Sequence, residues 1–265
     1  MRVAIGQMSV GLGARANLAT IGRLVDEAVA DGATLVVFPE GAMASDADVA
    51  KVVATAQPMN GEFVTALREL AADRSIALVA GTWEADGEAT FNTSVSISAD
   101  GEIVATYRKV HLFDAFGFRE SEFVTPSSTF AGATFETAET TFGLITCYDL
   151  RFPESSRIAV DAGARVLLAP AAWVPGPRKL EHWRVLARAR AIENTCFVVA
   201  ANQALPFGIG HSIVVDPNGE VVAELGDAEE IVTVDLDLDA VDATRVVNPS
   251  LANRRFHVVP TGTDG

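Results

Sequence analysis

The feature that most constrains the fold of this chain is the alternation of apolar runs of strand length with amphipathic helical patterns. Residues 34–38 form such an apolar run, which is typical of a strand that is covered on both faces. An amphipathic pattern precedes this run, and we expect Asn17 to cap its helix and Gly32 to end it. Alternation of this kind predicts a protein of the α/β class.

The alternation continues through two β-rich halves that have helices in a similar order. We expect further helices at residues 61–73, 153–162 and 180–194, and strands at residues 2–8, 76–83, 93–98, 103–109, 142–147, 166–170, 196–202, 211–216, 220–225 and 231–236. Asp100 with Gly101, and residues 217–219, carry the turn signals of two hairpins. If helices cover one face of each sheet, the remaining apolar faces are expected to pack on each other.

Composition limits the classes of function. With 265 residues and 49% hydrophobic content, the chain can bury one large core. Its net charge of −15 argues against nucleic acid and anionic membrane surfaces as partners. The start carries no secretory signal pattern, no run is long enough to cross a membrane, and the chain has two cysteines. We therefore expect a cytoplasmic protein.

Three chemically complementary groups stand at the ends of expected strands: Glu40, Lys109 and Cys147. A thiolate is a nucleophile, a carboxylate can take the thiol proton and later activate water, and an ammonium can lower the thiol pKa and stabilise an oxyanion. Each residue also has a structural interpretation, since Glu40 can cap a turn, Lys109 can lie on a solvated edge and Cys147 can pack in a strand. The catalytic interpretation depends on the three occurring together.

The motifs around these residues resemble those of the nitrilase superfamily of carbon–nitrogen hydrolases, and in particular its Nit-type amidase branch. The matching stretches are VVFPE at 36–40, YRKVHLFD at 107–114, FRES at 118–121, TCYDLRFPE at 146–154, ARAIEN at 189–194 and GHSIVVDPNG at 210–219. The resemblance extends from residue 1 to about residue 255, so we expect a hydrolase domain over 1–255 and a C-terminal tail over 256–265.

The resemblance implies a four-layer α-β-β-α sandwich that extends across a dimer interface, as a homodimer or a higher homo-oligomer. The apolar tail from Val246 to Val259, with Phe256, is a candidate for crossing to the neighbour. The resemblance also implies a catalytic triad of Glu40, Lys109 and Cys147, with no metal and no organic cofactor.

A second carboxylate near the triad is implied as well. Glu120 and Glu122 compete for this position, and the six-residue step from Glu120 to Pro126 matches the Nit-type pattern, so we select Glu120. Its expected role is to orient Lys109 and the substrate. The backbone N–H of Tyr148 is expected to hold the oxyanion together with Lys109. A set of charged residues is expected to form internal ion pairs behind the cysteine turn, namely Arg151, Glu154, Arg188, Arg190 and Glu193.

The substrate pocket is less clearly specified. Trp173 follows an expected strand end and is a candidate apolar wall, while Arg178, Lys179 and Arg184 are candidates for holding a distal carboxylate of the substrate. The three cations also suit a solvated helix start. Arg184 departs from the resemblance, because many Nit-type members carry an acidic residue at this position.

The favoured function is a cysteine-dependent amidase that cleaves a small linear carboxamide to an acid and ammonia, of the omega-amidase or deaminated-glutathione-amidase type. A nitrilase or an N-carbamoyl amidase is the alternative within the enzyme class. A catalytically idle member that serves as an interaction scaffold is the alternative of another class, and the complete triad disfavours it.

Overall fold

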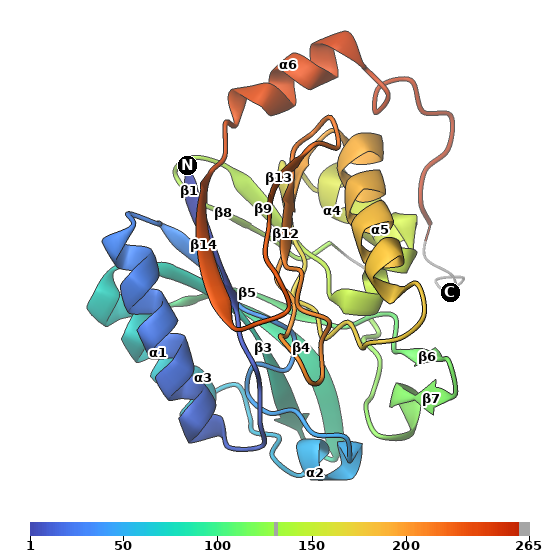
Figure 1. The fold of residues 1–265 in the computed structure, drawn as a ribbon. Coiled ribbons are helices and arrows are strands. Elements are labelled where there is room, and N and C mark those ends of the chain that lie inside the picture. The colour runs from blue at the N-terminus through green and yellow to red at the C-terminus, as the bar shows by residue number, and fades with distance from the viewer. Residues whose placement is uncertain (130–131, 260–265) are drawn as a thin grey trace.

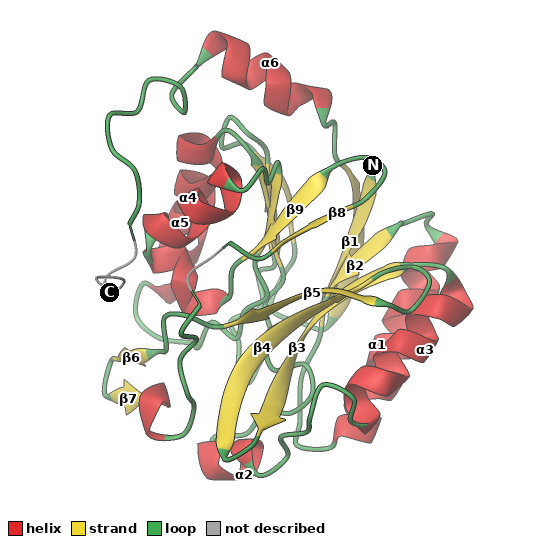
Figure 2. Cartoon of the chain, turned by 180° about the vertical axis from the view of Figure 1, so that it is seen from behind, coloured by secondary structure: helices red, strands yellow, loops and turns green. Residues whose placement is uncertain are grey.

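The computed structural model describes residues 1–129 and 132–259 as two six-stranded sheets and the helices that cover them (Figures 1 and 2). The first sheet has the order β14-β1-β2-β3-β4-β5, with strands Glu230–Asp235, Arg2–Gln7, Leu35–Val37, Ala77–Asp86, Ala89–Ile97 and Ile103–Arg108. The second has the order β13-β12-β11-β10-β9-β8, with strands Val221–Glu224, Ile213–Val215, Phe197–Ala200, Val166–Leu168, Thr141–Leu144 and Thr134–Glu136.

Helices cover the outer face of each sheet. Helices α1 (Ala14–Ala30) and α3 (Glu62–Arg74) pack on the first sheet, and α4 (Pro153–Asp161) and α5 (Lys179–Asn194) pack on the second (Figure 2). The inner faces form a third apolar core between the sheets. This arrangement confirms the predicted four-layer α-β-β-α sandwich.

Strand β2 shows how the sequence produces these layers. Successive side chains of a strand point to opposite faces, so an apolar run can serve two cores at once. Val36 lies in the core beneath α1 and α3, whereas Leu35 and Val37 lie in the core between the sheets. All three side chains are fully buried, as expected of a strand covered on both faces.

Both sheets contain parallel strands that deliver residues to one end of the sandwich. Strand β2 lies parallel to β1 and β3, and β10 lies parallel to β9 and β11. Glu40 follows β2, Cys147 follows β9, and Trp173 follows β10. The crevice beyond the carboxyl ends of parallel strands is a common place for ligands.

The structure corrects several details of the sequence interpretation. Asn17 does not cap α1, because Gly13 is the N-cap; Asn17 is buried inside the helix and donates hydrogen bonds to the carbonyl oxygens of Gly11 and Met43. Four short helices or strands were not expected, namely α2 (Val49–Val53), the hairpin strands β6 (Asp114–Ala115) and β7 (Phe118–Arg119), and strand β8. None of the described helices combines the length and apolarity needed to cross a membrane.

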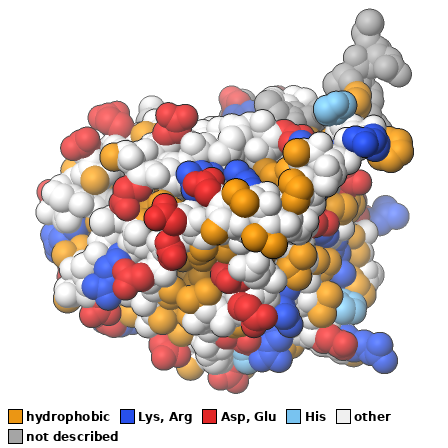
Figure 3. Space-filling model, turned by 90° about the horizontal axis from the view of Figure 1, so that it is seen from above, with side chains coloured by type: hydrophobic (Ala, Val, Ile, Leu, Met, Phe, Trp, Pro, Cys, Tyr) orange, Lys and Arg blue, Asp and Glu red, His pale blue; other side chains and the backbone are white. Residues whose placement is uncertain are grey.

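Helix α6 (Asp239–Val247) follows β14 and leads into the C-terminal segment. Val246, Val247, Phe256 and Val259 are all more than 70% exposed, and Figure 3, which views this side of the molecule, shows hydrophobic side chains among acidic and basic ones. The predicted dimer contact through this segment and the predicted domain boundary at residue 255 stay predictions. Residues 260–265 of the expected tail lie outside the described residues.

Candidate active site

The backbone that carries Glu40 is pressed against strand β3. A Cβ atom on Gly81 would lie 2.6 Å from Cα of Glu40, so the close approach requires glycine at this position. The Glu40 carboxylate accepts hydrogen bonds from Nζ of Lys109 at 2.8 Å and from the backbone N–H of Ala172 at 2.7 Å. The carboxylate is therefore held by contacts with both halves of the chain.

Lys109, immediately after β5, joins two carboxylates. Its ammonium lies 2.8 Å from Oε1 of Glu40 and 2.9 Å from Oε2 of Glu120. Glu120 begins a 3-10 turn (Glu120–Glu122) and also accepts the backbone N–H of Phe113 at 2.6 Å. Glu40, Lys109 and Glu120 are each at most 5% exposed, so this charged group is almost fully removed from water.

Asn92 on β4 is the residue of this group that sequence reasoning missed. Its side-chain amide donates to Glu40 at 2.7 Å and to Glu120 at 2.9 Å, so one NH₂ group bridges the two carboxylates. Its backbone oxygen accepts the N–H of Lys109 at 2.8 Å. Asn92 is almost fully buried in a strand that pairs with the strand before Lys109, and no local signal in the sequence indicates this placement.

Cys147 begins a 3-10 turn (Cys147–Arg151) rather than ending a strand, and its φ of 46° lies in the left-handed region. Backbone strain of this kind in a non-glycine residue is concentrated at functional sites. The carboxylate of buried Asp149 supports the turn, because it accepts the backbone N–H of Thr146 at 2.9 Å and the hydroxyl of Tyr107 at 2.8 Å. It also contacts Nδ1 of His111 at 2.7 Å.

The Lys109 charge acts to lower the pKa of the Cys147 thiol, as expected from the sequence, but other effects outweigh it. Burial, followed by the charge of the Glu40 carboxylate, raises the pKa of the Cys147 thiol well above its usual range. Burial would also raise the pKa of Glu40, but the Lys109 charge and the hydrogen bonds to Glu40 outweigh it and lower that pKa. The resting site thus holds a carboxylate, an ammonium and a neutral thiol.

This ionisation pattern predicts a broad plateau of activity with pH. If ionised Glu40 takes the thiol proton, its lowered pKa keeps it competent into the acid range, so kcat/KM falls only below about pH 4. The carboxylates of Glu120 and Glu40 raise the pKa of Lys109 despite its burial, so the ammonium persists to above about pH 10. A pH profile of kcat/KM tests this, and an acid limb near neutrality would contradict the assignment of Glu40.

Glu40, Lys109, Glu120 and Cys147 line one pocket that encloses about 740 Å³ of empty space, part of which is open to solvent. Three of the predicted substrate-binding residues also line this pocket, namely Tyr148, Trp173 and Lys179. Tyr148 and Phe113 meet edge to face at a centroid distance of 5.1 Å. Trp173 is locked in place, because its indole N–H donates to the carbonyl oxygen of Lys179 at 2.9 Å.

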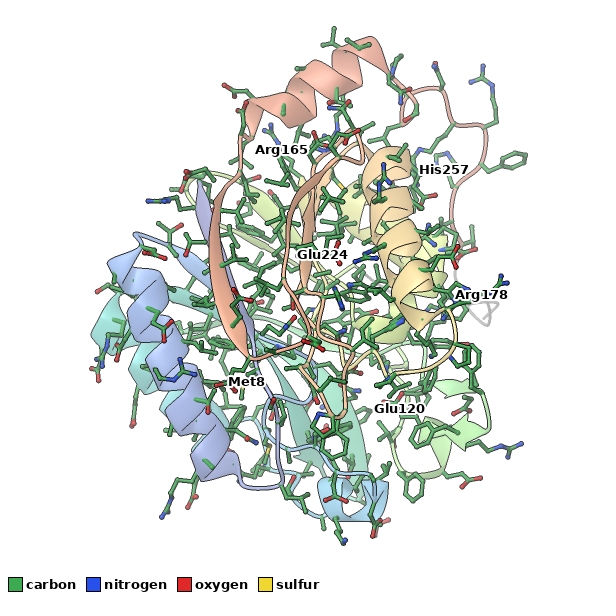
Figure 4. The ribbon with its side chains drawn as sticks, in the orientation of Figure 1. Met8, Glu120, Arg165, Arg178, Glu224 and His257 are labelled. Atoms are coloured by element: carbon green, nitrogen blue, oxygen red, sulfur yellow. The ribbon has the colours of Figure 1, made fainter. Side chains whose placement is uncertain are left out.

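Arg178 and Arg184 do not line this pocket. Arg178 is an exposed residue with φ 58° before α5, and Figure 4 shows it at the outer edge of the molecule. Arg184 lies on another face of α5, where it pairs with Glu224 at 2.7 Å, and Glu224 is well separated from Glu120 in Figure 4. Of the three candidate cations, the structure brings Lys179 to the pocket.

The expected internal ion-pair set is also not formed as a set. Arg190 pairs with Glu193 at 2.6 Å, but Arg188 donates to the carbonyl oxygen of Gly219 and Glu154 is exposed. Arg151 stacks on aromatic rings instead of meeting a carboxylate. Across residues 1–129 and 132–259, no group of three or more His, Cys, Asp or Glu side chains is placed to hold a metal ion.

Comparisons with known proteins agree with this site. Residues 2–246 match the family model for carbon-nitrogen hydrolase. The chain is 36% identical over 259 residues to the deaminated glutathione amidase of Escherichia coli O157:H7, covering 97% of this chain and 98% of that protein. It is also 37% identical over 207 residues to an omega-amidase of Saccharomyces cerevisiae, covering 72% of this chain and 69% of that protein.

Solved structures of nitrilase-superfamily proteins have a similar fold. The structure of Saccharomyces cerevisiae Nit3, a member of branch 10 of the nitrilase superfamily, superposes with a TM-score of 0.86 at 32% identity and covers 97% of both chains. An amidase from Nesterenkonia sp. AN1, in which acrylamide is added at the active-site cysteine, has a TM-score of 0.81 at 29% identity, covering 93% of this chain and 97% of that one. The chain belongs to the carbon-nitrogen hydrolase family and has the fold of the nitrilase superfamily.

Proposed function

We propose that this protein is a cysteine-dependent amidase that cleaves the C–N bond of a small linear carboxamide and releases ammonia. The observation that carries the proposal is the convergence of Cys147, Glu40, Lys109 and Glu120 in one pocket. Cys147 and Glu40 line the same pocket, so a nucleophile and a base stand together in it. A scaffold has no need of this buried charged group, which is costly to desolvate.

In the first half of the cycle, the thiol proton passes to Glu40 while sulfur attacks the carbonyl carbon of the amide. Lys109 and the backbone N–H of Tyr148 stabilise the resulting oxyanion. The C–N bond then breaks, and Glu40 gives its proton to the leaving nitrogen, so ammonia departs and a thioester remains on Cys147. The bridging amide of Asn92 and the carboxylate of Glu120 hold Glu40 and Lys109 in position throughout.

In the second half, Glu40 takes a proton from water as the oxygen attacks the thioester carbonyl. A second oxyanion forms at the same donors and collapses with cleavage of the C–S bond. The sulfur recovers the proton from Glu40, and the carboxylic acid product leaves. One carboxylate thus serves both halves of the cycle.

A panel of amides, nitriles and N-carbamoyl compounds distinguishes this function from its alternatives. We expect steady ammonia release from linear carboxamides, no turnover of nitriles and no release of CO₂ from carbamoyl compounds. Turnover of nitriles would instead identify a nitrilase, and CO₂ release would identify an N-carbamoyl amidase. No turnover of any compound by a folded protein would favour the scaffold.

A further inference from the structure

Gln203, which comes shortly after β11, lines the catalytic pocket but has no part in the cycle described above. It is 1% exposed, and its side-chain Nε2 donates to the backbone carbonyl oxygen of Glu40 at 2.8 Å. That oxygen belongs to the peptide group between Glu40 and Gly41, and the φ of 59° at Gly41 lies in the left-handed region that glycine adopts readily. Gln203 therefore connects the second sheet to the main chain of the base.

Glu40 is held at both of its ends by this part of the chain. The Gln203 amide holds its backbone carbonyl, and the backbone N–H of Ala172 holds its carboxylate at 2.7 Å. The peptide group that joins Ala171 to Ala172 makes a second bond, because its carbonyl oxygen accepts the backbone N–H of Gln203 at 3.0 Å. The contacts thus form a closed ring through Glu40, which fixes the direction in which the Glu40 side chain extends.

The neighbouring peptide group holds the nucleophile, because the carbonyl oxygen of Pro170 accepts the backbone N–H of Cys147 at 2.9 Å. Glu40 follows β2 of the first sheet and Cys147 follows β9 of the second, so the two residues lie after strands of different sheets. Contacts that cross between the sheets therefore set the separation of base and thiol. Residues 170–172, together with Gln203, supply such contacts for both groups.

The surroundings of Gln203 make its amide a fixed donor. Its backbone carbonyl oxygen accepts the N–H of Gly210 at 2.9 Å, and a Cβ atom on Gly208 would clash with the same oxygen, so the chain packs closely here. Its side-chain Oε1 is buried and has no hydrogen-bond partner within residues 1–129 and 132–259. Because an unpaired buried oxygen costs free energy, stability alone explains an amide at this position poorly.

We propose that Gln203 is a positioning residue of the reaction, whose amide ties the main chain of Glu40 to the segment 170–172 that also holds Cys147. This inference rests on the proposed amidase function and adds a residue to it. Without the amide, the peptide group between Glu40 and Gly41 can rotate, because glycine tolerates conformations that other residues do not, and the carboxylate moves with it. A displacement of about 1 Å between reacting groups can lower a rate about 100-fold.

The test is Gln203→Met, which removes the donor and keeps a side chain of similar length. Its kcat for ammonia release from a linear carboxamide is expected to fall by about 10- to 100-fold. KM is expected to change less than about threefold, because Glu40 acts in both halves of the cycle and its displacement slows both. Initial rates over a range of amide concentrations measure the two constants. A kcat within about threefold of the parent would overturn the positioning role.

Gln7→Met is the matched control for the loss of a buried amide. Gln7 ends β1, is fully buried away from the pocket lining, and donates through Nε2 to the carbonyl oxygen of Gly226 at 2.8 Å. Because its Oε1 also accepts the backbone N–H of Ser212, this variant should lower the melting temperature at least as much as Gln203→Met does, yet keep kcat within about threefold of the parent. Equal losses of kcat in the two variants would mean that Gln203 acts on stability alone.

A measurement without turnover separates this inference from the amidase function. In a Cys196→Ala background, iodoacetamide should alkylate Cys147 about tenfold more slowly in Gln203→Met than in the protein that retains Gln203, because the thiol reacts as a thiolate and Glu40 takes its proton. The mass of the intact protein follows the reaction. Equal alkylation rates would overturn the positioning role even if the parent is an amidase. If the rates differ but the parent releases ammonia from no linear carboxamide, the amidase function fails and the positioning of Glu40 against Cys147 stands.

Discussion

Replacing Cys147 by Ala is expected to lower kcat for ammonia release by at least about 10⁴-fold, because the remaining groups have no nucleophile with which to form the thioester. The fold is expected to persist, since the substitution removes a single sulfur atom from a turn that Asp149 supports through its own hydrogen bonds. The melting temperature should shift by no more than about 5 °C. Ammonia release and a thermal melt measured on the same preparation check both expectations.

Cys196→Ala provides the matched control. Cys196 is fully buried beside β11, and burial raises its pKa to about 12, so it is an inert thiol away from the pocket lining. This variant should retain the parent's kcat and lose about 1–2 kcal/mol of stability through a small cavity. Comparable activity in the Cys147 variant and the parent would rule out the proposed mechanism.

Glu40→Gln is expected to stop both halves of the cycle and to lower kcat by about 10³-fold or more. The amide keeps nearly the same shape, but it cannot take the thiol proton or activate water. In addition, the NH₂ group of the Gln side chain would face either the Lys109 ammonium or the Ala172 N–H. Both of these groups donate hydrogen bonds to the Glu40 carboxylate in the parent protein. Rapid-quench measurement should therefore detect no initial burst of ammonia.

The size of any burst distinguishes the two roles of Glu40. An amount of ammonia equal to the enzyme, followed by a stall, would mean that acylation proceeds without Glu40 and that this carboxylate acts on water alone. Recovery of steady turnover in Glu40→Asp, with a lower rate from the shorter reach, would instead support a single base that serves both steps.

Local patterns in the sequence predicted two sheets covered by helices, whereas the resemblance to the nitrilase superfamily implied the four-layer sandwich and the triad. Residues 34–38 show by their apolar run that a strand is covered on two faces, and the structure buries Leu35, Val36 and Val37 in two different cores. A reactive residue directly after such a run is held at a rigid strand end, which is how Glu40 and Lys109 could be selected. These inferences need no knowledge of distant contacts.

Other parts of the site depend on contacts between elements that are far apart in the chain, so the sequence could not supply them. Asn92 bridges Glu40 and Glu120 through the register of β4, and nothing near residue 92 indicates two carboxylates beside it. Arg178 and Lys179 are adjacent and both basic, yet a left-handed residue at 178 turns one toward solvent and the other into the pocket. Likewise, the raised pKa of Cys147 results from burial that only the assembled core provides.

The pairing of β14 with β1 has a consequence for how the molecule is made. Arg2 pairs with Asp235, so one edge of β1 stays open until β14 has left the ribosome. The first sheet, which carries Glu40 and Lys109, therefore cannot be completed before the strands of the second sheet, which carries Cys147, have been synthesised. Such long-range pairing slows folding and leaves a strand edge exposed to aggregation, which chaperones counteract. The two halves mature together, and the first sheet is complete only after β14 has been synthesised.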